Sequence, residues 1–144
     1  MLKQLIAEGF GQAEDYNCAE KIIRGANEAY GLNLSEEGMK LAGGFGGGLA
    51  IESTCGALCG AVMALSHLLI DTVAHQSQEL KPMTKELLEG FQAEMGSIYC
   101  DALKNDYRTP EKKCQVVIEK AAEHLDKLVS RIQEESQVEH QGSN

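Results

Sequence analysis

Apolar residues recur at spacings of three and four along most of the chain, and this periodicity predicts helices. The clearest stripe comprises Cys55, Leu58, Val62, Leu65 and Leu69. It predicts a long central helix from about Thr54 to Ala74, with one face in the core. No stretch alternates between apolar and polar residues as a half-buried strand would. We therefore expect an all-α fold, a single-domain bundle of about five to six helices with a glycine-rich loop before the central helix.

Residues typical of helix ends bound the other predicted helices. Asn17 and Glu20 form a capping box, so a helix begins at Cys18, and Gly31 can end it. Further helices are predicted from Leu2 to about Ala13, from Ser35, from Pro82 to Gly96, in a short segment led by Cys100, and from Thr109-Pro110-Glu111. The chain is polar from Glu134 onward. We therefore expect one helical domain, residues 1–133, and a disordered polar tail, residues 134–144.

Five glycines fall within the six residues from Gly43 to Gly48, directly before the central helix. A regular helix there would carry a large entropic penalty. The run does not match G-x-G-x-x-G, and no Lys-Ser or Lys-Thr follows it, so nucleotide binding is poorly supported. The glycines favour close approach of the backbone to another element or to a cofactor, and a mobile connector is the alternative.

Composition narrows the functional classes. The chain has 144 residues, enough for one domain with a sizeable core. Its net charge of −9, with no basic patch interleaved with aromatic residues, argues against nucleic-acid binding. Glu8 interrupts the segment where a secretory signal would be apolar, and the longest apolar segment is too short to cross a bilayer. We expect a cytoplasmic protein without a membrane span.

The five cysteines are the candidate functional residues: Cys18, Cys55, Cys59, Cys100 and Cys114. In a reducing compartment such cysteines more often bind a metal or carry redox chemistry than form structural disulfides. All except Cys59 lie within about the first turn of a predicted helix. Ser53 or Thr54 is the expected N-cap of the central helix. Cys55 would then lie in the first turn, where free amides and the helix dipole are expected to lower the pKa of its thiol.

The alternation of helix directions predicts that four of these thiols meet. Short connections make successive helices antiparallel, which places Cys18, Cys55, Cys100 and Cys114 at one end of the bundle. Four thiols at one site can hold an iron–sulfur cluster, hold zinc, or cycle between dithiol and disulfide. Their spacings are not those of a zinc ribbon, a common ferredoxin or a thioredoxin-type C-x-x-C. The spacing therefore leaves all three chemistries open.

Several segments together match the pattern of one known family. They are Cys18, Gly-Phe-Gly-Gly-Gly at 44–48, Cys55-Gly56-Ala57-Leu58-Cys59-Gly60, Gly96-Ser97-Ile98-Tyr99-Cys100 and Cys114. With this set the chain resembles the C-GCAxxG-C-C family of redox-active proteins from about Asn17 to Leu128. The resemblance makes Cys18, Cys55, Cys100 and Cys114 the four family cysteines. A related domain in split-Soret cytochromes is associated with an iron–sulfur centre, which implies that cofactor by analogy.

These arguments give a site and a function to test. We expect a redox-active protein in which Cys18, Cys55, Cys100 and Cys114 are redox thiols or metal ligands. Cys59 falls on a variable position of the motif, so it could be a ligand, a resolving thiol or a core residue. The candidate cofactor contacts are Gly46, Gly47, Gly48, Gly56 and Gly60.

The cofactor and the partner stay open at this level. An iron–sulfur cluster is one candidate, zinc is the alternative, and a dithiol/disulfide protein would need no cofactor. The redox partner is either a protein or a small molecule, and a homo-oligomer is left open. The alternative function is a structural zinc-binding module or a helical interaction module without redox turnover. No catalytic triad or carboxylate pair can be argued, so enzymatic turnover is not established.

Overall fold

The computed structural model describes residues 1–142, and the side chains of residues 1–138. Within them the chain forms seven α-helices and no strand, so the predicted all-α class is confirmed. Five helices have eight residues or more: α2 (Cys18–Tyr30), α4 (Gly56–Leu69), α5 (Leu80–Met95), α6 (Cys100–Tyr107) and α7 (Gln115–Gly142). The short elements are α1 (Leu2–Ala7), α3 (Glu36–Lys40), η1 (Leu41–Phe45), η2 (Gly48–Glu52) and η3 (Ala74–Gln76).

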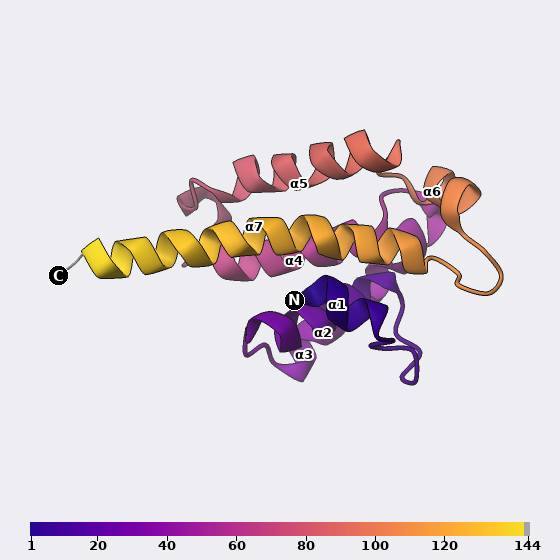
Figure 1. Ribbon diagram of the computed structural model, residues 1–144, viewed down its shortest axis with the longest axis horizontal. Helices are drawn as coiled ribbons and strands as arrows, with labels where there is room; N and C mark the ends of the chain where they lie inside the picture. Colours follow the sequence, from indigo (N-terminus) through magenta and orange to yellow (C-terminus); the bar gives the residue numbers. More distant parts are fainter. Residues whose placement is uncertain (143–144) are drawn as a thin grey trace.

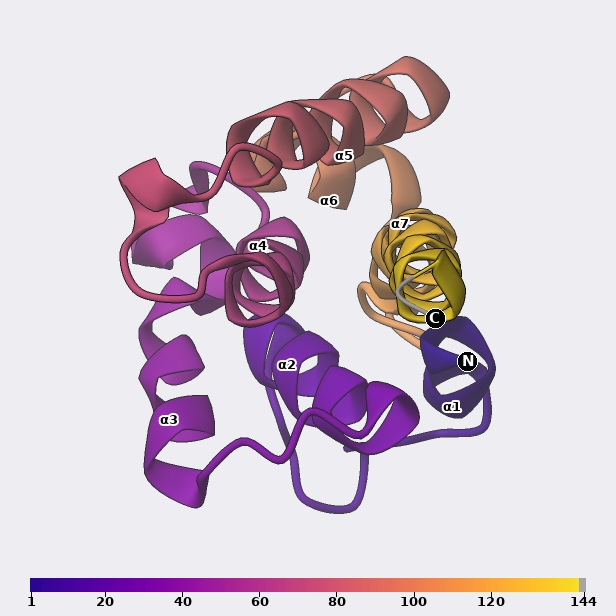
Figure 2. The same cartoon turned by 90° about the vertical axis from the view of Figure 1, so that its left-hand side faces the viewer.

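The long helix α7 packs against α1, α4 and α5 (Figures 1 and 2). Helix α5 lies along it, with the Phe91 ring edge-on to the His124 ring at a centroid distance of 6.1 Å. Helix α4 lies along another side of α7, and α2 packs against α4. The helices α2, α4 and α7 all begin at the same end of the molecule, on the right in Figure 1. Because these three helices begin at one end, the residues at their starts lie at that end of the molecule.

Helices α2 and α4 approach each other closely in the core. A Cβ atom at Gly60 would lie 2.8 Å from the carbonyl oxygen of Ala19, so glycine at this position lets the two backbones meet. Around this contact Ile22, Leu58 and Leu65 are fully buried. The core is mostly aliphatic, as expected for a chain with few aromatic residues.

Helix α1 is held against α7 at both of its ends. The Asp126 carboxylate accepts hydrogen bonds from the backbone amides of Leu2 at 2.9 Å and Lys3 at 3.0 Å, and so caps α1 from another helix. The Gln115 side chain donates to the carbonyl oxygen of Ile6 at 2.9 Å. Because α1 has only six residues, these contacts from α7 supply the stability that its length cannot.

Three predicted helix bounds are wrong. The central helix ends at Leu69 and not near Ala74, because Ile70 is extended, with φ −95° and ψ 121°. Helix α1 ends at Ala7 and not near Ala13, because Gly9 and Gly11 adopt positive φ angles of 100° and 80° and turn the chain. The last helix begins at Gln115, later than Thr109-Pro110-Glu111 predicts.

A local turn takes the place of the first helical turn predicted at Thr109. Thr109 and Lys113 exchange backbone hydrogen bonds, and the Thr109 hydroxyl accepts from the amide of Lys112 at 3.0 Å. Lys113 has a φ of 52°, which a helix does not allow. Cys114 therefore stands directly before α7 and not one turn inside it.

The segment predicted as a polar tail lies at the end of α7. Residues 134–142 continue the helix, and the side chains of 134–138 are exposed. No proline or glycine interrupts α7 before Gly142, and extending an existing helix costs far less than starting one. Residues 143–144 lie outside the described residues. The boundary after residue 133 stays a prediction.

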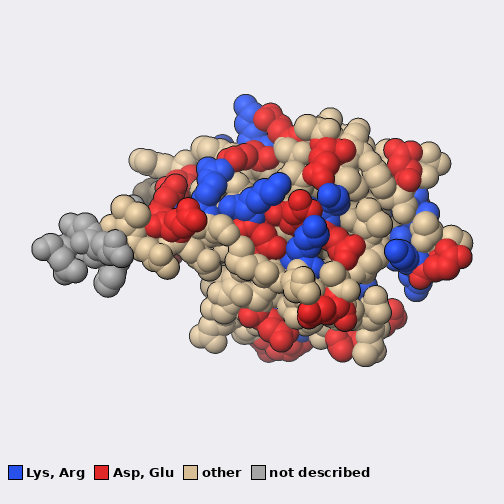
Figure 3. All heavy atoms as spheres, viewed as in Figure 1, with Lys and Arg blue, Asp and Glu red and all other residues tan. Residues whose placement is uncertain are grey.

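The surface over α7 carries interleaved acidic and basic side chains (Figure 3). Ion pairs on this face include Lys120 with Glu94 at 2.8 Å and Lys3 with Glu123 at 3.0 Å. Exposed pairs of this kind contribute little to stability. In the part of the chain that the structure describes, no helix has both the length and the apolar character needed to cross a membrane.

Candidate functional site

Four cysteines stand at the starts of four different helices and line one cavity. Cys18 is the first residue of α2, Cys55 is the N-cap of α4, Cys100 is the first residue of α6, and Cys114 directly precedes α7. All four contribute to the wall of a cavity of about 850 Å³. The alternation of helix directions predicts this convergence, and the shared end of the bundle is visible in Figure 1.

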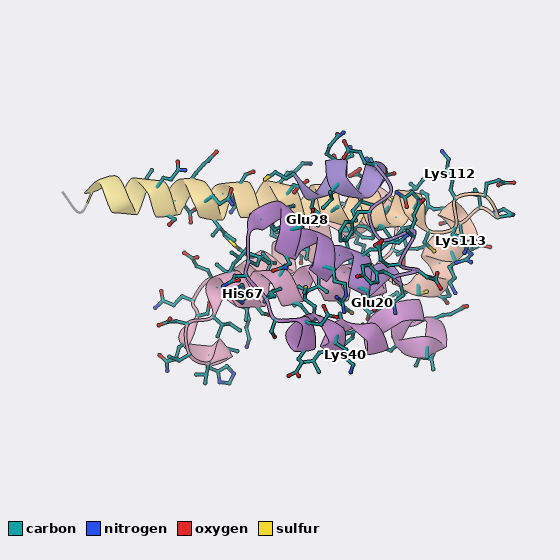
Figure 4. All side chains as sticks on the ribbon, turned by 90° about the horizontal axis from the view of Figure 1, so that it is seen from below. Glu20, Glu28, Lys40, His67, Lys112 and Lys113 are labelled. Carbon is teal, nitrogen blue, oxygen red and sulfur yellow. The ribbon has the colours of Figure 1, made fainter. Side chains whose placement is uncertain are left out.

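Cys18 is positioned by the capping box that the sequence predicts. The Asn17 side chain accepts from the amide of Glu20, and the Glu20 carboxylate accepts from the amide of Asn17, both at 3.0 Å. The Asn17 amide group also donates to the carbonyl oxygen of Gly43 at 3.0 Å. Asn17 thus stabilises the start of α2 and also binds the glycine-rich segment through Gly43. Figure 4 labels Glu20 on this helix.

Cys55 and Cys100 are joined through their backbones. The amide of Cys55 donates to the carbonyl oxygen of Ile98 at 2.8 Å, and the amide of Cys100 donates to that of Ser53 at 2.6 Å. Between these bonds Thr54 and Tyr99 form an isolated antiparallel bridge. The starts of α4 and α6 are therefore held together. A single bridge is too short to leave an alternating pattern, so the sequence gives no signal for it.

Two glycines let the backbone approach the cysteines. A Cβ atom at Gly56 would lie 2.5 Å from the sulfur of Cys18, and one at Gly48 would lie 2.6 Å from the Cβ of Cys100. Gly48 also has a φ of 62°, which favours glycine. The predicted close approach therefore occurs, and its partners are protein atoms.

The other candidate glycines have different surroundings. Gly47 lines the cavity, as Gly56 does. Gly46 packs against the Asn17 side chain, and Gly60 packs against α2. A role in holding a cofactor stays a prediction for all five glycines. The packing at Gly46, Gly48, Gly56 and Gly60 gives a separate reason why glycine stands at each of these positions.

The expectation that Cys55 has a lowered pKa is wrong. Neither Ser53 nor Thr54 caps α4; Cys55 itself occupies the N-cap position. Its side chain is 5% exposed, and this burial raises the pKa of the thiol to about 12. Hydrogen bonds from the amides of Leu58 and Ala57 act in the opposite direction but do not offset the burial. The helix begins at Gly56, two residues after the predicted start at Thr54, and the Cys55 thiol before it is protonated at neutral pH.

The thiols are close enough to affect one another. Burial raises the pKa of Cys100, and negative charge on Cys18 or Cys114 raises it further. The ammonium group of Lys104 acts in the opposite direction. Negative charge on Cys18 also raises the pKa of Cys55. Several thiolates in this cavity would therefore repel one another unless positive charge is supplied.

Basic side chains around the cavity are functional candidates that the sequence argument missed. They are Lys21, Lys104, Arg108, Lys112 and Lys113. The guanidinium group of Arg108 lies 3.5 Å from the sulfur of Cys114. The basic residues directly before Cys114 are the sequence signal for this charge, but Thr109-Pro110-Glu111 there favours a helix start.

Cys59 is set apart from the other four thiols. It lines a smaller, apolar hollow of about 250 Å³ together with Leu58, Val62 and Met63, and it is not part of the wall of the larger cavity. Its side chain is half-buried, and burial raises its pKa, as does negative charge on Cys18. Cys59 is therefore near Cys18 but faces different surroundings.

All five cysteines are free thiols in this structure. Among the described residues, no three His, Cys, Asp or Glu side chains are arranged to hold one metal ion. His67 lies near the far end of α4 (Figure 4), where its Nε2 is 2.9 Å from the carbonyl oxygen of Leu32. The four thiols share a cavity without forming a closed ligand set.

These features define an all-helical protein with four cysteines at helix starts around one cavity rimmed by basic side chains. Residues 16–128 match the family described as "Putative redox-active protein (C_GCAxxG_C_C)". The match covers most of the chain, and the chain belongs to this family. Comparison with curated proteins gave no match, and neither did comparison with solved structures.

Proposed function

We propose that this protein transfers electrons through an iron–sulfur cluster held by Cys18, Cys55, Cys100 and Cys114. The observation that carries the proposal is that four thiols from four helix starts line one cavity. Four cysteine thiolates are the usual ligand set of such a cluster. When bound, the cluster would supply one-electron redox chemistry that thiols alone do not offer.

The electrostatics of the cavity fit a thiolate-bound group. Thiolates gather at one site only where positive charge offsets their repulsion, and the cluster irons would supply such charge. The Lys104 ammonium and the Arg108 guanidinium lie beside Cys100 and Cys114 and would offset what remains. The amides of Leu58 and Ala57 at the start of α4 favour the thiolate of Cys55 and act in the same sense.

The raised thiol pKa values favour this proposal over disulfide exchange. The thiolate is the form that attacks a disulfide, and Cys55, with a pKa of about 12, is almost entirely protonated at neutral pH. A bound metal deprotonates a coordinating thiol outright, so burial does not prevent ligation. Binding one group through all four thiols would require them to come closer than they are here.

The direct test is anaerobic reconstitution with iron and sulfide. We expect a brown protein that contains both elements and has the visible absorption of an iron–sulfur centre. Changing Cys18, Cys55, Cys100 or Cys114 singly to serine should lower the iron and sulfide content. A colourless protein without iron after reconstitution would reject the cluster.

Two further results would assign the site to the other chemistries. Tightly bound zinc, with the fold lost on chelation, would make this a structural zinc protein. A rise in the free-thiol count on reduction of the metal-free protein would assign it to disulfide chemistry. The five free thiols are consistent with the reducing, cytoplasmic compartment that we expect.

A further inference from the structure

We propose that the cavity beside the four thiols also binds a small molecule with two or more negative charges, held at its mouth by Lys21, Lys112 and Lys113. This proposal deepens the proposed function. The identification of the bound molecule as the redox partner rests on that function. The binding itself depends only on the cavity and its basic side chains. The anionic group that such a molecule presents to the lysines is a phosphate or a carboxylate.

The first observation is the distribution of charge. The chain has 22 acidic and 13 basic residues, but the cavity wall has five basic side chains against three acidic ones. An acidic protein thus keeps a local excess of positive charge at its cysteine site. Such an excess attracts small anions, whereas the net charge of −9 repels a long polyanion.

The second observation is that three of these basic side chains form no ion pair with any side chain of residues 1–138. Lys104 pairs with Glu52 at 3.3 Å, and Arg108 contacts the thiol of Cys114. Across the described residues, by contrast, no acidic side chain pairs with Lys21, Lys112 or Lys113. The aliphatic stem of Lys21 packs beside Gly11, and the residue is half-buried.

The third observation is that the turn fixes the backbone of two of these lysines. The Thr109 hydroxyl and carbonyl groups accept from the amides of Lys112 and Lys113, at 3.0 and 2.7 Å. Figure 4 shows both lysines at the end of the molecule where α7 begins. A preformed turn lowers the entropic cost of binding. The cavity volume of about 850 Å³ lies within the usual range for small-molecule sites.

Alkylation of the metal-free protein tests the electrostatic part of the proposal. Iodoacetate is anionic and iodoacetamide is neutral. The alkylation rate with iodoacetate divided by that with iodoacetamide therefore reports the electrostatic potential at each thiol. We expect this ratio, measured by mass spectrometry, to be several-fold higher at Cys114 than at Cys59, which lies outside the cavity. Added salt should reduce the difference. Equal ratios at the two thiols would overturn the proposal.

Calorimetric titration with inorganic pyrophosphate and with citrate tests binding and separates phosphate from carboxylate recognition. We expect at least one probe to bind saturably, and the K112E/K113E variant to bind it at least about tenfold more weakly. The K81E/K85E variant makes the same change in net charge on exposed residues of α5 and should bind like the wild type. Circular dichroism checks that both variants are folded.

The outcomes separate this proposal from the proposed function. No saturable binding of either probe, or equal weakening in both variants, would reject the anion site. Iron and sulfide content is measured on the same two variants. A wild-type protein that binds pyrophosphate or citrate but takes up no iron would retain the anion site and reject the cluster.

Discussion

Gly56 faces the thiol of Cys18 so closely that a Cβ atom at this position would lie 2.5 Å from the sulfur. The same atom would lie 2.7 Å from the carbonyl oxygen of Phe45. The first residue of α4 therefore touches both the start of α2 and the glycine-rich segment. The position of one cavity thiol depends on the absence of a side chain on a neighbouring helix.

The Gly56→Ala variant should be destabilised and should load less iron. An added methyl group must displace Cys18 or the backbone at Phe45, and overpacking of this kind costs about 1–3 kcal/mol. Denaturant unfolding measures the change. Gly43→Ala is the matched control, since a Cβ there would meet nothing within 4 Å. Equal stability of the two variants would contradict the proposed collision.

Removing the Asp126 carboxylate should loosen α1 from α7. In the wild type the Tyr30 hydroxyl also donates to the Asp126 carboxylate, at 2.6 Å. Asp126→Ala removes the acceptor of this hydroxyl and of the Leu2 and Lys3 amides. We expect a loss of about 2 kcal/mol in the free energy of unfolding. The control is Asp71→Ala at an exposed position, which should change little. Faster hydrogen exchange at α1 in the Asp126 variant alone would locate the effect.

The free energy of unfolding should fall as the pH rises above 9. Burial raises the pKa of Cys55 from its ordinary value of 9.0 to about 12, so the unfolded chain loses this proton at a lower pH than the folded one. The stabilisation is thus fully present below pH 9 and decreases as the pH rises towards 12. At pH 10 the loss from this thiol should be about 1.4 kcal/mol.

Denaturant unfolding between pH 8 and pH 10 measures that slope, and Cys55→Ser should flatten it. Only the pH dependence is compared, because the substitution also changes the absolute stability. Burial also raises the pKa of Cys59 and Cys100, and these thiols leave a residual slope in the variant. Identical slopes in the wild type and the variant would show that the Cys55 thiol is not shielded as described.

Cys59→Ser should retain the iron and sulfide content of the wild type after reconstitution. The Cys59 thiol lines the apolar hollow and not the larger cavity, so it is not expected to be a ligand. Cys18→Ser provides the comparison, because Cys18 is near Cys59 but lines the cavity. If both variants lose iron to the same extent, Cys59 belongs to the ligand set.

Deleting residues 134–144 should leave the folded body intact. The side chains of residues 134–138 are exposed, and the Arg131–Glu86 ion pair between α7 and α5 lies before the deletion. We expect the free energy of unfolding to change by less than about 1 kcal/mol. Circular dichroism should show the loss of helical signal from the deleted turns. A large destabilisation would contradict the domain boundary predicted after residue 133.

Local sequence was sufficient for several of the helix ends. The capping box at Asn17 and Glu20 is present, and Gly31 and Gly96 end their helices in the left-handed conformation. These features depend on residues a few positions apart, so a linear pattern contains them. The convergence of the four cysteines could also be predicted, because it follows from the alternation of successive helices.

The tertiary structure alone decided the chemistry of the site. The raised pKa of Cys55 results from burial by distant segments, and the bridge between Thr54 and Tyr99 joins residues 45 positions apart. The basic side chains at the cavity come from α2, α6 and the turn before α7. Burial and electrostatic potential are sums over everything nearby in space, which local patterns do not record. The sequence by itself determined where most of the helices lie and that four of their cysteines stand at one end of the bundle, whereas packing determined that the Cys55 thiol is protonated and that the cavity is basic.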